Sequence, residues 1–165
     1  MNKGNTVGSR SKNDLAYIAG FLDGDGSLML QIKRRTDSKL GFRIMATICF
    51  YQSSAHKESL AWIQTILQSG YLTDRNDGIT ELRINGFGKV AEILAELKPF
   101  IRFKKIQANA LYKASKLLSE KSFKFFSLEN KNLLVSAILA IQNNNYKSGN
   151  KKRKSELIKI LGLTP

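Results

Sequence analysis

The stretch AYIAGFLDGDGS, residues 16–27, decides how the whole chain is interpreted. Leu15, Ile18 and Leu22 recur at three- and four-residue spacing, which places apolar side chains along one side of a helix. Beyond the stretch, apolar positions alternate with polar ones, as they do in a strand. The pattern therefore predicts a helix over residues 13–25 that passes directly into a strand.

Small residues form a second stripe on this helix, because Ala16, Gly20 and Gly24 are four residues apart. A glycine inside a helix is about 1 kcal/mol less favourable than alanine. The stripe is therefore typical either of a weak helix or loop, or of a helix against which another backbone passes closely. Its regular spacing favours the close approach.

Two carboxylates, Asp23 and Asp25, alternate with glycines where the helix ends. Residues two apart on a helix do not share a face, so the two acids are not expected to be equivalent. A negative charge in the last helical turn is unfavourable, which suggests that Asp23 has a positive partner such as a metal ion. An EF-hand calcium loop is excluded, because its glycine and glutamate positions hold Leu28 and Arg34. A plain turn and a Mg²⁺ site, which needs only one or two carboxylates, remain.

Alternating apolar and polar residues predict two hairpins further along the chain. Residues 27–35 and 42–51 form the first, and residues 71–75 and 79–84 form the second, across the turn Asn-Asp-Gly. Periodic segments also predict further helices, at residues 55–68 with Trp62 among the anchors, then at 87–97, 104–118, 130–142 and a short one at 156–161.

This order of elements predicts an α+β fold, with an αββαββα core followed by further helices. The hairpins are expected to join into one antiparallel sheet with helices over a single face. We expect a single domain over residues 1–165, with a core at about 13–142 and a basic tail at 143–165.

The charge balance points to a polyanionic partner. The chain has 27 Lys and Arg against 13 Asp and Glu, a net charge of +14. Nucleic acid is the favoured partner and an anionic membrane surface the alternative. The sheet face away from the helices fits DNA, because a two-stranded ribbon enters the major groove and basic or amide side chains bind base edges. Its basic and amide residues are Gln31, Lys33, Arg35, Arg43, Arg75 and Arg83, for which an ordinary solvated face is the alternative.

Cysteine and histidine are nearly absent. With Cys49 and His56 as the single residue of each type, an internal disulfide, a cysteine zinc site and a histidine-based nuclease centre are excluded. A reducing compartment fits. No apolar run approaches the ~18 residues of a membrane span, and the first residues lack a secretory signal.

Residues 18–26, IAGFLDGDG, line up with the motif of the LAGLIDADG homing endonucleases, and the αββαββα order also resembles that family's. Isoleucine replaces the motif's first leucine, and glycine replaces its second alanine. The likeness includes Tyr51-Gln52, Gly70-Tyr71 and residues 99–109, and covers roughly residues 14–120. It resembles the single-motif branch, which implies a homodimer whose two sheets form a saddle over a long pseudo-palindromic DNA site.

The resemblance implies roles for individual residues. Asp25 would be the metal ligand, with help from the backbone carbonyl of Gly24. Gln52 would order water near the metal, and Lys104 would stabilise negative charge on the phosphate. The role of His56 is open. Residues at the seam between subunits would be Ala16, Ala19, Gly20, Asp23 and Gly24.

Contacts with DNA are assigned to the outer face of the sheet and to the tail. On the sheet they are Ser27, Met29, Gln31, Lys33, Arg35, Arg43, Met45, Thr47, Tyr71, Thr73, Arg75, Glu81 and Arg83. In the tail they are Lys151, Lys152, Arg153 and Lys154, for which a disordered basic arm is the alternative.

The implied activity is metal-dependent hydrolysis that leaves a double-strand break. Mg²⁺ is the expected cofactor, Mn²⁺ a substitute, and Ca²⁺ is expected to support binding without cleavage. An organellar, intron-encoded origin in a chloroplast or mitochondrion fits. The alternatives are a maturase that binds intron RNA and a basic DNA-binding repressor. The intact Asp25 favours the nuclease, because binding alone does not require an acid near phosphate.

Overall fold

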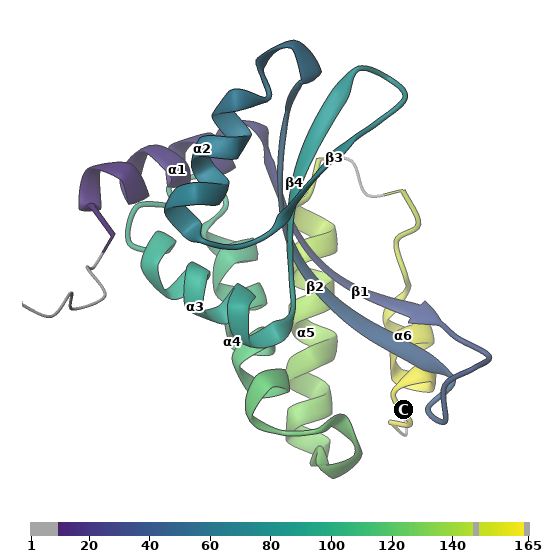
Figure 1. Ribbon diagram of the computed structural model, residues 1–165. Helices are drawn as coiled ribbons and strands as arrows, with labels where there is room; N and C mark the ends of the chain where they lie inside the picture. Colours follow the sequence, from purple (N-terminus) through teal and green to yellow (C-terminus); the bar gives the residue numbers. More distant parts are fainter. Residues whose placement is uncertain (1–9, 147–148, 164–165) are drawn as a thin grey trace, which may run out of the picture.

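Four antiparallel strands form the sheet of the computed structural model, which describes residues 10–146 and 149–163. They are β1 (Gly26–Arg34), β2 (Phe42–Ser53), β3 (Tyr71–Asp74) and β4 (Ile79–Asn85), in the order β1-β2-β4-β3 (Figure 1). Consecutive strands form the two predicted hairpins, and β2 pairs with β4 to join them. The predicted α+β class and the αββαββα order are confirmed.

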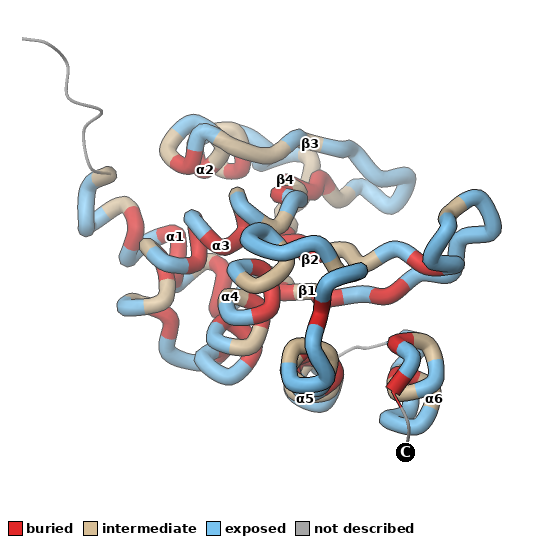
Figure 2. The backbone as a smooth tube through the Cα atoms, turned by 90° about the horizontal axis from the view of Figure 1, so that it is seen from below, coloured by how far each residue is buried: buried red, intermediate tan, exposed pale blue. Residues whose placement is uncertain are grey.

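One face of the sheet lies against the helices. Cross-strand partners on this face are apolar and buried, as in the row Leu28, Ile48 and Ile84. Burial of such side chains drives folding at roughly 25 cal/mol per Å². The helices are α1 (Lys12–Asp25), α2 (Glu58–Leu67), α3 (Phe87–Leu97), α4 (Lys105–Glu120), α5 (Leu128–Asn144) and α6 (Lys154–Ile160). Buried segments concentrate where α1, α3 and α4 meet β1 and β2 (Figure 2).

The two hairpins are staggered along β2. β1 pairs with the stretch from Phe42 to Phe50, whereas β4 pairs with the stretch from Thr47 to Ser53. The free ends of the hairpins therefore extend in different directions from the centre of the sheet (Figure 1). This stagger, together with strand twist, gives the outer face its curvature.

Some boundaries differ from the sequence-based prediction. The segment expected to open the second helix is a 3₁₀ turn, Ser54–His56, and α2 begins only at Glu58. Trp62 is not a core anchor, since it is 38 % exposed and stacks edge-on against Tyr17. The buried side of α2 consists of Leu60, Ile63 and Leu67, and Trp62 points away from it.

The C-terminal part is more integrated than a tail. α5 extends two residues past its predicted end, to Asn144. Leu157, Leu161 and Leu163, in and after α6, are buried in the same apolar cluster as the sheet. Residue 142 is therefore not a boundary of the core.

Arg10 fixes the start of α1 to two other helices. Its guanidinium donates to the carbonyl oxygens of Ile66 (3.0 Å) and Leu67 (2.9 Å), which lie at the C-terminus of α2. It also forms an ion pair with Glu96 on α3. A cation at a helix C-terminus is favourable.

Within the described residues, no helix has the length and apolar character needed to cross a membrane.

Candidate active site and nucleic-acid interface

Asp23 is a buried anchor. Its side chain is 8 % exposed and accepts hydrogen bonds from the backbone N–H groups of Arg102 (2.7 Å), Phe103 (3.1 Å) and Lys104 (3.0 Å). The positive partner expected for this acid is therefore a set of backbone amides, which stabilise a carboxylate in the same way. Asp23 holds the loop before α4 against the end of α1.

Lys104 closes the end of the same helix. Its ammonium is buried and donates to the carbonyl oxygens of Leu22 (3.0 Å) and Asp23. Burial lowers the pKa of Lys104, and the nearby Asp23 and Asp25 carboxylates only partly offset this. An ammonium has three N–H donors, so one remains for a ligand beside the helix end.

Asp25 differs from Asp23 in exposure and in hydrogen bonding. It is exposed, and within the described part of the chain it has no hydrogen bond or ion pair. The neighbouring Gly24 is also exposed. Gly26, in contrast, is sterically required, because a Cβ there would lie 2.8 Å from the Leu22 carbonyl oxygen. The helix can therefore turn directly into β1 with Asp25 at its end.

The oxygen ligands at Asp25 suit a Mg²⁺ ion whose remaining ligands come from water and DNA phosphate. Among the residues that the structure describes, no group of three His, Cys, Asp or Glu side chains is placed to hold a metal ion. Mg²⁺ is commonly held by one or two carboxylates, with water and phosphate oxygens as the other ligands. An exposed carboxylate next to an exposed glycine fits that role, and a closed protein cage for Ca²⁺ or Zn²⁺ does not fit.

Gln52 lies near this helix end. Gly26 pairs with Phe50, so Asp25 and Gln52 are at the same end of the β1–β2 ladder. The Gln52 side-chain oxygen accepts the Ser53 N–H at 2.8 Å, which leaves its amide N–H₂ as the group that can order water. His56 is exposed in the 3₁₀ turn that follows β2.

The stripe of small residues on α1 is an open surface. Ala16, Gly20 and Gly24 are all exposed, and a Cβ at either glycine would meet no atom of residues 10–146 or 149–163 within 4 Å. Nothing in that part of the protomer therefore requires glycine at these positions. Ala19 and Asp23, which were also assigned to the seam, are buried within the protomer itself.

The outer face of the sheet carries the residues assigned to DNA. Register places Ser27, Cys49, Arg83 and Tyr71 in one row across all four strands. Most side chains on this face are exposed or half-buried. Exposed are Gln31, Lys33, Arg43, Tyr71, Thr73 and Arg75, and half-buried are Ser27, Met29, Met45 and Arg83. Arg35 lies just past β1, where it forms an exposed ion pair with Asp37.

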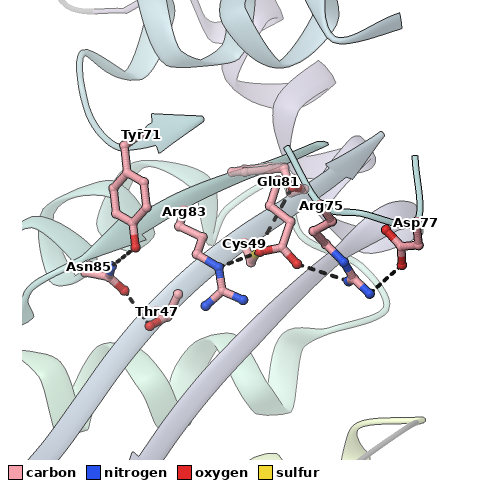
Figure 3. Close-up of polar contacts among 9 residues, drawn as sticks. Thr47, Cys49, Tyr71, Arg75, Asp77, Glu81, Arg83 and Asn85 are labelled. Carbon is pink, nitrogen blue, oxygen red and sulfur yellow. Dashed lines mark hydrogen bonds and ion pairs between the residues drawn. The ribbon is translucent and has the colours of Figure 1, made fainter. Parts of the chain in front are cut away.

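Glu81 is a buried acid at the centre of this face. One carboxylate oxygen accepts from Arg75 NH1 at 3.1 Å, and the other accepts from Arg83 Nε at 2.5 Å (Figure 3). Burial by itself would raise the pKa of Glu81, but the hydrogen bonds and charges of Arg83 and Arg75 outweigh burial and lower it. Arg75 also pairs with Asp77 at 2.6 Å. Glu81 was expected to touch DNA; the structure places it between two arginines that are more exposed than it is.

A second series of side-chain hydrogen bonds lies beside Glu81. Thr47 is buried and donates to Asn85 Oδ1 at 2.6 Å, and Asn85 Nδ2 donates to the Tyr71 hydroxyl at 3.1 Å (Figure 3). Asn85 was missed because the predicted strand ended one residue earlier. Its position two residues after Arg83, on the same face, was the available signal.

Cys49 is the cross-strand partner of Arg83 and is fully buried. Burial raises the pKa of its thiol to about 11. The thiol is therefore protonated at neutral pH and packs as a small apolar group.

The basic segment 151–154 is held in place. The Gln142 side chain on α5 accepts the Lys152 N–H at 3.0 Å and donates to the Lys152 carbonyl at 3.2 Å. Lys152 also pairs with Glu156 at 3.1 Å. The exposed charges of this segment are Lys151, Arg153 and Lys154. A groove of about 620 Å³ separates the segment from β1 and includes Lys33 and Arg34 in its lining.

With this geometry in view, the chain belongs to the LAGLIDADG endonuclease family, whose sequence model matches residues 18–130. Among curated proteins it is 33 % identical over 103 residues to DNA endonuclease I-CvuI of Chlorella vulgaris. It is 30 % identical over 103 residues to DNA endonuclease I-CreI of Chlamydomonas reinhardtii. Each match covers 62 % of this chain and spans less than two thirds of the relative, 64 % and 63 % respectively.

Solved structures agree with this assignment. The fold superposes on homing endonuclease I-CvuI in complex with its target in the presence of 2 mM Ca, with a TM-score of 0.76 and 25 % identity. That superposition covers 93 % of this chain and 98 % of the other. An archaeal intron-encoded homing endonuclease complexed with DNA, I-Vdi141I, has the same fold at 19 % identity and a TM-score of 0.76.

Proposed function

We propose that this protein is a site-specific homing endonuclease that acts as a homodimer on a long pseudo-palindromic DNA site. The observation that carries the proposal is Asp25, an exposed carboxylate without a partner in the described chain, at the end of the family's motif helix. A purely structural acid would be satisfied internally, as Asp23 is.

The open stripe on α1 supports the dimer. A second copy can approach Ala16, Gly20 and Gly24 closely, because no described residue of the protomer occupies the space beside the two glycines. An isologous contact along this stripe brings the two Asp25 residues together at the ends of their helices. The dimer then has two equivalent acids, one for each DNA strand.

Asp25 and the Gly24 carbonyl would hold Mg²⁺, which when bound would polarise the scissile phosphate and lower the pKa of a water ligand. Lys104 Nζ binds the carbonyl oxygens of Leu22 and Asp23 at the same helix end, and its third N–H would stabilise negative charge on the phosphate. The free amide N–H₂ of Gln52 orients water. No covalent intermediate with the protein is required, and each strand is cut once.

The curved outer face supplies the DNA-binding surface. Its arginines, lysines and amides read base edges in the major groove, while the basic segment 151–154 binds backbone phosphates. The net charge of +14 supports a polyanionic partner. A relative was crystallised with its target in the presence of Ca²⁺. By analogy, we expect Ca²⁺ to support DNA binding here. That Ca²⁺ does not support cleavage and that Mn²⁺ replaces Mg²⁺ are further parts of the proposal.

An organellar, intron-encoded origin, in a chloroplast or mitochondrion, is part of this proposal. The maturase alternative is not favoured, since binding to RNA alone does not require an exposed acid such as Asp25 beside the phosphate path.

A cleavage assay tests the proposal. Supercoiled plasmid that carries the joined exon sequences flanking the gene is incubated with the protein and Mg²⁺ or EDTA. We expect linear product when the protein is given Mg²⁺ and none when it is given EDTA. A plasmid without the insert should not be cut. Absence of linear product with Mg²⁺ and with Mn²⁺ contradicts the proposed activity.

A further inference from the structure

The buried carboxylate of Glu81 binds two arginines on the outer face, which differ in how many of their guanidinium N–H groups are already bonded. Arg83 uses only Nε within the described residues, so its NH1 and NH2 groups extend beyond the contact (Figure 3). Arg75 is engaged at both ends, by Glu81 through NH1 and by Asp77 through NH2. The two arginines are therefore not equivalent donors.

We propose that Glu81 is a positioning residue for sequence recognition, which fixes Arg83 so that its terminal fork meets a guanine in each half-site. This inference rests on the proposed function. A guanidinium binds the O6 and N7 atoms of guanine through two parallel N–H groups, and this pairing requires a fixed orientation. Lysine lacks this planar fork and does not reproduce its fixed geometry.

Burial makes the position of Glu81 well defined. Its side chain is only 6 % exposed, whereas Arg75 and Arg83 are 46 % and 36 % exposed. Glu81 is thus covered by the arginines that it binds, and DNA on this face meets the arginines first. A buried acid between two arginines also limits how far either side chain can swing toward a phosphate.

Opposing effects on affinity and selectivity follow from this arrangement. Replacing Glu81 with glutamine removes a negative charge from the DNA-facing surface, which strengthens sequence-independent attraction to phosphate. The same change releases Arg83 and weakens its preference for one base. A residue with only a structural role would instead weaken binding to every sequence.

Selection from a randomised duplex library, with Ca²⁺ in place of Mg²⁺, separates these outcomes. We expect the wild type to show a guanine preference of about tenfold or more at one position of each half-site, as one bidentate pair provides. Glu81→Gln should reduce that preference at least about fivefold and leave affinity for unrelated duplex unchanged or higher. Arg83→Lys should weaken the same preference, since it keeps the charge without the planar fork.

A double-variant comparison tests whether Glu81 acts through Arg83. In an Arg83→Met background, Glu81→Gln should cause no further loss at that guanine position. Glu120→Gln, an exposed change of the same charge on α4, should leave all base preferences unchanged. If Glu81→Gln does not fold, Glu81→Asp, which shortens the carboxylate by one methylene, provides the same comparison.

The possible failures are distinguishable. A wild-type protein without any base preference contradicts the proposed site-specific function. A selective wild type whose preferences survive Glu81→Gln, or fall additively with Arg83→Met, overturns the role of Glu81 and leaves the function standing.

Discussion

The buried and exposed sides of α1 perform different tasks with similar residues. On the buried side, Leu22 packs in the core and Asp23 binds three backbone amides. On the exposed side, Gly20 faces open space and Asp25 has no partner in the described chain. Two aspartates separated by one residue thus differ completely. The side of the helix on which an aspartate lies, and not its residue type, decides whether it stabilises the fold or is available to bind a ligand.

The sharpest test of this difference is Asp25→Asn. We expect cleavage to fall by about 1000-fold or more, because the variant loses the charge that holds the metal at the phosphate. Thermal stability and DNA binding in Ca²⁺ should remain near those of the wild type. Plasmid cleavage and fluorescence anisotropy measure the two properties, and an equal loss of both would contradict the assigned role.

Asp23→Ala should show the opposite result. The variant leaves three backbone N–H groups without their acceptor, so the free energy of unfolding should fall by about 3 kcal/mol. Urea denaturation measures the loss. A variant as stable as the wild type would show that the loop before α4 is held by other contacts.

Gly20→Leu should act on assembly alone. The new side chain fits beside the protomer but obstructs a second helix, so the dimer dissociation constant should rise about 30-fold, or ~2 kcal/mol. Sedimentation velocity measures the change. Gly88→Leu, at an exposed glycine of α3, is the matched control. A monomeric wild type at micromolar concentration would remove the basis for the comparison.

The smallest expected effect concerns Lys104, which lies between the two sides. Its pKa is lowered by burial from 10.5, so the unfolded chain holds this proton more readily than the folded one. Stability contributed by this residue therefore rises as pH increases toward 10.5. In urea denaturation at pH 7 and pH 10, wild type should gain stability relative to Lys104→Met at the higher pH. A constant difference would refute this.

Local patterns predicted the elements of the fold but not the contacts between distant ones. The change of period at Gly26 and the apolar spacing of Leu15, Ile18 and Leu22 were sufficient to predict the helix and the strand that follows it. Asp23 was harder, because its donors lie 79 to 81 residues away and depend on how α4 packs. Trp62 was wrongly predicted to be buried because its apolar character was considered without its angular position around the helix.

On the outer face, alternation predicted which residues share a side but not which of them pair. Glu81 reaches Arg75 around a hairpin and Arg83 along a strand, and both contacts depend on side-chain geometry. Asn85 was lost through an error of one residue in a strand boundary. Boundaries of this kind are set by tertiary hydrogen bonds, which a local pattern does not contain.

Arg10 and Asp23 together give α1 a particular unfolding behaviour. A helix of 14 residues with two interior glycines is marginal alone. Here Arg10, two residues before the helix, is joined to α2 and α3, and Asp23 in the last turn is joined to the loop before α4. The helix therefore melts only when the surrounding layer opens, so amide hydrogen exchange in α1 should report global unfolding rather than fraying from either terminus.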